Sequence, residues 1–145
     1  MKKDNNNMMK VYVVEANLID GTPVVNMGVR TISKEDFLQQ AYKIIDCDLV
    51  DVREFECNGK YYDAWFDEEF FFSGKPLIAT LLLGDLKQNA FDLICGSIII
   101  AHSDEEGATC GITPQEASEL TDFMHKNYLK IQQARNMGLF GKKSA

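Results

Sequence analysis

The sequence predicts an α+β domain in which two helices pack on a mostly antiparallel sheet of about five strands with a central hairpin. Two runs rich in Val, Phe, Tyr and Trp flank Asn58-Gly59. Asn-Gly between such runs favours a type I′ turn, because both central residues must adopt positive φ. Two further segments, 33–45 and 113–135, carry apolar residues at helical spacing. The length of 145 residues fits a single domain.

Four other runs are strand candidates. Lys10 to Glu15 is β-branched and aromatic and predicts the first strand, and Val24 to Arg30 predicts a weaker second one. Leu77 to Leu83 is an uninterrupted apolar run that suits a buried strand and a short buried helix equally well. Leu93 to His102 is β-branched towards its end and predicts one central strand.

Both helices carry start signals. Ser33 and Asp36 resemble a capping box before the first helix. Thr113, with Pro114 at the first helical position and Glu116 three residues after the Thr, forms a stronger one before the second helix, which we expect to end near residue 135. The predicted buried stripes are Phe37, Leu38, Ala41, Ile44 and Ile45 in the first helix, and Ala117, Leu120, Phe123, Met124, Tyr128 and Ile131 in the second.

The two ends of the chain are expected to lie outside the domain. Residues 1–9 are polar and Asn-rich and predict a mobile tail, residues 10–135 form the single domain, and residues 136–145 form a C-terminal tail. No apolar run approaches the roughly 18 residues of a membrane helix, and the start of the chain lacks the apolar stretch of a secretory signal. The expected location is the cytoplasm.

Charge divides the chain into an acidic body and basic ends. Residues 11–125 hold 7 Lys and Arg against 21 Asp and Glu, whereas the ends restore the total to −7. An acidic body repels phosphates, so direct binding of nucleic acid is not expected. The acidic surface either meets a basic surface of a partner protein or serves only solubility.

Sequence motifs for catalysis are absent. The chain has no phosphate-binding glycine loop, no nucleophile elbow and no metal-ligand spacing of His or Cys. The four cysteines show no C-x-x-C pair and are expected to be free thiols. No catalytic residue, metal or cofactor is therefore assigned.

Acidic and aromatic residues supply the candidate partner-binding set. Trp65 and Phe66 are adjacent and should face opposite sides of a strand, so one belongs to the core and the other is a candidate interface anchor. Phe70-Phe71-Phe72 would form a docking or dimer site if exposed, although we expect at least two of the three in the core. The full candidate set is Trp65, Asp67, Glu68, Glu69, Phe71, Asp104, Glu105, Glu106, Leu139 and Phe140.

The carboxylates permit three interpretations. Two solvated turns at strand ends are the simplest. Rigidly spaced carboxylates could instead imitate the phosphates of DNA and block a nucleic-acid-binding protein. The carboxylates form two acidic clusters: the first is Asp63, Asp67, Glu68 and Glu69, and the second is Asp104, Glu105 and Glu106. If the two clusters met near Trp65, they could bind a small ligand or supply general acids.

The C-terminal tail contains one short motif. Asn136-Met137-Gly138-Leu139-Phe140 shares its final Leu-Phe pair with the peptide by which bacterial replication proteins dock on the sliding clamp. A sliding clamp is therefore one candidate partner. The alternative is that Leu139 and Phe140 fold back on the domain as a hydrophobic latch.

Several segments together resemble a known family. They are residues 62–69 (YDAWFDEE), 94–100 (ICGSIII), 104–107 (DEEG) and 112–116 (ITPQE). In this order they resemble the bacterial and bacteriophage family catalogued as domain of unknown function 3846, with the likeness covering roughly residues 10–125. The resemblance implies a setting on phages or mobile elements, whose small proteins commonly bind a host protein, including components of host defence. The leading hypothesis is thus a small, acidic, non-enzymatic accessory protein that binds a host protein.

Overall fold

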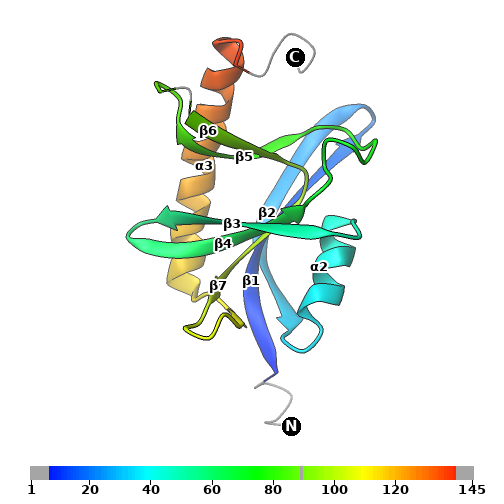
Figure 1. Ribbon diagram of the computed structural model, residues 1–145, viewed down its shortest axis with the longest axis vertical. Coiled ribbons are helices and arrows are strands. Elements are labelled where there is room, and N and C mark those ends of the chain that lie inside the picture. The colour runs from blue at the N-terminus through cyan, green and yellow to red at the C-terminus, as the bar shows by residue number, and fades with distance from the viewer. Residues whose placement is uncertain (1–6, 89, 140–145) are drawn as a thin grey trace.

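The computed structural model describes residues 7–88 and 90–139, and it confirms the α+β class (Figure 1). The elements in chain order are β1 (Met8–Ile19), β2 (Thr22–Ser33), α2 (Phe37–Ile45), β3 (Val50–Cys57), β4 (Lys60–Asp67), β5 (Ala79–Asp85), β6 (Ala90–Cys95), β7 (Ile98–Ser103), β8 (Thr109–Cys110) and α3 (Pro114–Asn136).

The main sheet has six strands, one more than expected, and every described pairing in it is antiparallel. Five of them lie in the order β2-β1-β7-β4-β3, and the short β8 pairs with β7; β5 and β6 form a separate two-stranded sheet. In the β3–β4 hairpin Cys57 lies opposite Lys60. Between them Asn58 and Gly59 have φ of 54° and 82°, the positive values that a type I′ turn requires.

The main sheet is covered on both faces because its central strand alternates between two apolar cores. Ile98 and Ile100 of β7 belong to the core that α3 and the β5–β6 sheet cover. Ile99 and Ala101 belong to the core that α2 covers. All four side chains are fully buried, so β7 is apolar at four consecutive positions, 98–101, rather than at every second one.

Helix α3 extends past the main sheet and joins it to the β5–β6 sheet. The side chain of Asn127, which is 5% exposed, accepts a hydrogen bond from the Leu82 amide at 2.8 Å and donates one to the Leu82 carbonyl at 2.7 Å. A side-chain amide thus replaces a neighbouring strand at the free edge of β5. Ile131 and Ala134 continue the same face of the helix against Leu82.

One strand prediction is wrong, and one open alternative is decided by the structure. The expected single strand from Leu93 to His102 is two strands, because Gly96 adopts a φ of 90° and turns the chain between the two sheets. Only β7, the second part, is central. The ambiguous run from Leu77 to Leu83 forms a strand, β5, beginning at Ala79.

The start of the second helix is confirmed and that of the first is not. Thr113 caps α3 reciprocally with Glu116. Ser33, by contrast, remains in β2, and α2 begins after Asp36, whose side chain makes no capping hydrogen bond. Two residues expected in the buried stripes are exposed, because both helices cover the sheet with a narrower face than the sequence suggests: Leu38 at 47% and Tyr128 at 59%.

The predicted N-terminal tail is too long. Strand β1 begins at Met8 and extends the sheet through antiparallel pairing with Ser33, and Met9 is 5% exposed. Residues 1–6 lie outside the described part of the chain. Within residues 7–88 and 90–139, neither helix has the length and apolar character to cross a membrane.

Candidate functional site

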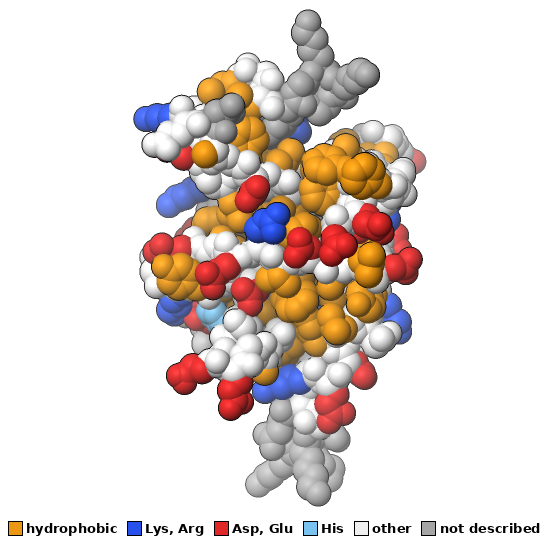
Figure 2. Space-filling view, viewed as in Figure 1, with side chains coloured by type: hydrophobic (Ala, Val, Ile, Leu, Met, Phe, Trp, Pro, Cys, Tyr) orange, Lys and Arg blue, Asp and Glu red, His pale blue; other side chains and the backbone are white. Residues whose placement is uncertain are grey.

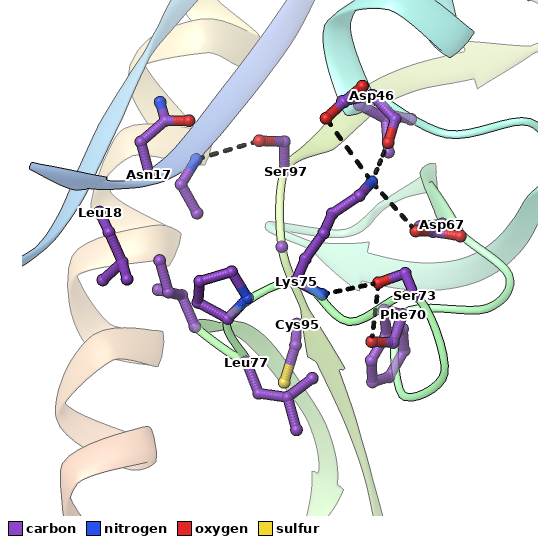
Figure 3. Close-up of a pocket in the computed structure, with 15 residues that line it drawn as sticks. Asn17, Leu18, Asp46, Asp67, Phe70, Ser73, Lys75, Leu77, Cys95 and Ser97 are labelled. Atoms are coloured by element: carbon purple, nitrogen blue, oxygen red, sulfur yellow. Dashed lines mark hydrogen bonds and ion pairs between the residues drawn. The ribbon is translucent and has the colours of Figure 1, made fainter. Parts of the chain in front are cut away.

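A cleft of about 200 Å³ lies between the closed end of the β1–β2 hairpin, the C-terminus of α2 and the segment 68–78, called here the Phe loop (Figure 3). Asn17 and Leu18 line it from the hairpin, and Lys75 and Leu77 line it from the Phe loop. The loop connects β4 to β5, so it passes from one sheet to the other.

Lys75 fixes the Phe loop to the two neighbouring elements. Its ammonium donates to the backbone carbonyl of Asp46 and lies 3.4 Å from Oδ2 of Asp67. Asp46 ends α2 in the left-handed conformation, and a cation at this position complements the negative end of the helix dipole. Figure 3 shows the ammonium between the two acidic residues. The loop is therefore held at its base.

Asp67 is the one buried member of the first acidic cluster. It is 7% exposed, and its Oδ1 accepts a hydrogen bond from the Glu69 amide at 2.9 Å. A buried carboxylate needs such partners, and Lys75 supplies the opposite charge. Asp67 is thus engaged within the fold, whereas Glu68 and Glu69 are exposed beside it.

The three consecutive phenylalanines do not behave as expected. Phe70 points inward, with its ring 6.1 Å from that of Phe66. Phe71 is 60% exposed and Phe72 is 88% exposed. The prediction that at least two of the three pack in the core is wrong. The reason is local: tight turns, in which the Phe72 amide bonds the Glu69 carbonyl at 2.8 Å, direct only Phe70 towards the sheet.

Other exposed apolar side chains lie around the same cleft. Leu18 (44% exposed) and Ile19 (55%) come from the hairpin tip, and Leu77 (51%) comes from the Phe loop. We call Leu18, Ile19, Phe71, Phe72 and Leu77 the aromatic end. In Figure 1 the hairpin tip and the loop lie together at the upper right. The same corner of Figure 2 shows a hydrophobic patch with acidic side chains below it.

Cys95 also lines the cleft, but it is not a reactive thiol. The residue is 3% exposed, and burial raises the pKa of its thiol to about 11. It therefore stays protonated near neutral pH, whereas the nucleophilic form of cysteine is the thiolate. All four cysteines are free, and the described residues contain no group of three or more His, Cys, Asp and Glu side chains placed to hold a metal ion.

Trp65 is not the exposed anchor that the sequence suggested. It lies under α2, with its ring edge-on to that of Phe37 and 4.9 Å between the ring centroids. It packs against the core that α2 covers. Phe66 packs in the core that α3 and the β5–β6 sheet cover. The alternation of the two side chains is as expected, but both faces of the sheet are covered, so Phe66 is buried and Trp65 is partly buried.

The two acidic clusters do not meet. Strands β4 and β7 run antiparallel, with Asp63 opposite Ala101 and Trp65 opposite Ile99. Asp67 therefore lies near the start of β7, while residues 104–106 follow its far end. Asp104 forms a turn in which its Oδ1 accepts from the amides of Glu106 and Ala108, each at 2.9 Å. Residues 104–106 are exposed and form a solvated turn.

A polar cluster at the start of α3 was not predicted from the sequence. Glu116 is 6% exposed, and its Oε2 lies 2.9 Å from Nε2 of His102 and 3.2 Å from Nζ of Lys60. Nδ1 of the same imidazole lies 2.9 Å from the Tyr61 carbonyl. Burial acts to raise the pKa of Glu116, but the hydrogen bonds from the Thr113 amide, His102 and Lys60 outweigh burial and lower that pKa to about 2. The capping box signals Glu116, but nothing in the sequence signals His102.

The C-terminal candidates are only partly described. Leu139 packs against the cluster formed by Leu82, Ile131 and Ala134, and its amide bonds the Ala134 carbonyl at 3.1 Å. This contact is the one expected of a latch. Phe140 lies outside the described residues, so docking on a sliding clamp stays a prediction.

Comparison with known proteins places the chain in a family. The family model described as domain of unknown function (DUF3846) matches residues 9–125, so the chain belongs to this family. No curated protein and no solved structure matches the chain. The membership suggested by the quoted segments is confirmed.

Proposed function

We propose that this chain is a small acidic protein without enzymatic activity that binds a partner protein through the aromatic end, as an accessory factor carried by a phage or mobile element. The observation behind the proposal is the exposure of Phe71 and Phe72, at 60% and 88%, on a loop that Lys75 fixes at its base. Large aromatic side chains are the commonest anchors of protein interfaces. Fixing them before binding lowers the entropic cost of association.

The surroundings of the aromatic pair indicate the chemistry of the partner. Glu68 and Glu69 are exposed next to it, and Asp46 and Asp48 are exposed at the end of α2. An apolar patch with an acidic rim fits an apolar pocket flanked by Lys and Arg. The proposed partner is therefore a host protein with a basic surface, for which components of host defence are one source.

A phosphate mimic uses the same charges differently. Such a protein would bind through its carboxylates alone, and its competition with DNA would weaken as salt rises. The exposed phenylalanines favour docking, because solvent-exposed aromatic rings add nothing to an imitation of phosphates. The two mechanisms separate experimentally, because one depends on the rings and the other only on the acids.

The test is affinity capture from bacterial lysate with four baits. These are the intact chain, Phe71→Ser/Phe72→Ser, Glu68→Lys/Glu69→Lys, and Tyr61→Ser as the matched control. Tyr61 is an aromatic residue of similar exposure, 62%, away from the Phe loop. We expect one partner to be lost with the phenylalanine variant, weakened at least tenfold with the charge variant, and retained with the control.

Other results would reject the proposal. A partner lost only with the charge variant would indicate a phosphate mimic. A partner that all four baits capture equally would place the interface elsewhere. If none of the baits captured a protein from several hosts, a small ligand in the cleft beside Lys75 would become the better explanation.

A further inference from the structure

Strand β2 forms one edge of the main sheet, and after Pro23 it has little of the usual protection of an edge strand. It lies at the end of the strand order, and among the described residues no strand pairs with its outer side. Its twelve residues pair with β1 without a bulge. Arg30 is its one charged residue, and that charge is paired with Glu15 at 2.8 Å. Natural sheets usually block such an edge with charges or bulges, because free backbone groups invite pairing with another strand.

An apolar groove runs beside this edge. It has a volume of about 950 Å³, and its walls are β2, the start of β5 and the second half of α3. Val25 of β2 is 38% exposed, while Tyr128 and Leu129 of α3 are 59% and 67% exposed. Exposed apolar side chains thus face one hollow from both sides. An open edge and an apolar groove next to it form one continuous surface.

Charge selects the occupant of this surface. The chain has 22 Asp and Glu residues, yet none of the residues that line the groove is acidic. His125 and Arg135 are the basic side chains among them. Two copies of a chain with net charge −7 repel each other through most of their surfaces. They can approach through the face that lacks acidic groups. There the free edge of β2 and the apolar side chains of one copy meet the same edge and side chains of the other.

We propose that the protein is a homodimer in which the β2 strands of two copies pair antiparallel across a twofold axis. The two main sheets then form one continuous sheet. Val25 and Val29 of each copy lie at the junction, and Tyr128 and Leu129 of both α3 helices cover it from the same side. A twofold contact is self-complementary, as an exposed edge strand running antiparallel to its own copy permits.

Sedimentation velocity at protein concentrations from about 5 to about 200 µM tests the dimer. The intact chain is expected at twice its mass of 16.4 kDa. Two variants place acids on the two sides of the proposed contact: Val25→Glu/Val29→Glu on the β2 edge, and Tyr128→Glu/Leu129→Glu on the α3 wall of the groove. Each should raise the dimer dissociation constant at least tenfold. Leu38→Glu/Leu49→Glu is the matched control, because both leucines are 47% exposed and neither lines the groove.

The outcomes are distinct. A single mass of 16.4 kDa for the intact chain at every concentration would overturn the dimer. So would a dimer that survives both groove variants, or one that the control variant abolishes. Circular dichroism checks that each variant is folded. Should one variant not fold, the other remains decisive, and hydrogen exchange of the intact chain should show slower exchange in residues 24–30 at high than at low concentration.

The groove and the aromatic end share Leu77, but the dimer and the partner interface are tested by different variants. Phe71→Ser/Phe72→Ser should leave the dimer intact, because neither residue lines the groove. Capture of a partner by the intact chain combined with a monomeric mass would reject the dimer alone.

Discussion

Glu116 shows how one side chain can serve both a helix start and a sheet. One oxygen accepts the Thr113 amide at 2.9 Å, as in any capping box, and the other meets His102 and Lys60 from neighbouring strands. The pKa of Glu116 is lowered from its ordinary 4.5 to about 2. The folded state therefore favours the ionised form more than the unfolded state does. Its stabilising contribution is complete above pH 4.5 and is lost as pH falls from there towards 2.

We expect Glu116→Gln to lower the free energy of unfolding by about 2 kcal/mol at pH 7, because the amide keeps the Thr113 hydrogen bond but loses the charge that faces Lys60 and His102. The difference between variant and wild type should shrink steadily below pH 4.5. Urea unfolding at several pH values measures it. Glu105→Gln, in an exposed turn, is the control and should have no effect above about 0.5 kcal/mol. A difference that stays constant down to pH 2.5 would refute the ionic explanation.

At the scale of elements, the side chain of Asn127 holds the β5–β6 sheet against α3. It satisfies both backbone groups of Leu82, and those groups are buried. Truncation would leave a buried amide and a buried carbonyl without partners, each costing about 1–3 kcal/mol. We expect Asn127→Ala to destabilise the protein by at least about 2 kcal/mol, measured by chemical unfolding. Faster hydrogen exchange should be confined to residues 79–95 when the protein is still folded.

Gln133→Ala is the control for Asn127→Ala, because Gln133 lies on the same helix and is exposed. Alanine is at least as good a helix former as glutamine, so this change should be nearly neutral. Equal destabilisation by both variants would mean that the helix itself is marginal, and that the contact with Leu82 contributes little.

The elements differ in how far the sequence determined them. Turns and caps that depend on local chemistry, such as Asn58-Gly59 and Thr113, lie where the sequence predicts them. The division at Gly96 was not predicted, because a single Gly-Ser pair between apolar residues can also lie within one strand, and only the positive φ of Gly96 separates the two sheets. Burial was misjudged for Trp65 and Phe72, since exposure depends on which elements cover a face. The aromatic end combines two segments about 50 residues apart, and no local pattern announces their contact.

At the scale of the whole molecule, the surface divides into apolar faces and an acidic remainder. Both proposed contact surfaces are apolar: the aromatic end has an acidic rim, and the groove lined by β2 and α3 has no acidic residue. The remaining acidic surface opposes unspecific association with other acidic surfaces. The acidic charge thus contributes to selectivity by limiting where another protein can approach.

The same acidic charge opposes folding, and salt should reveal it. Residues 11–125 hold three times as many acidic as basic residues, so compaction brings like charges together. We expect NaCl raised from about 0.02 to 0.5 M to increase the Tm by about 3 °C, which corresponds to about 1 kcal/mol for a domain of this size. The exposed ion pairs, such as Arg30 with Glu15, weaken in salt but contribute little.

Differential scanning calorimetry of Tyr128→Glu/Leu129→Glu separates this effect from dimer formation, because the variant should remain monomeric at all salt concentrations. KCl should act like NaCl if screening is the cause. Glu105→Lys/Glu106→Lys reduces the acidic excess by four charges and should reduce the response to salt. A Tm that falls as salt rises would show that the ion pairs outweigh the repulsion, and the acidic surface would then be a source of stability as well as of selectivity.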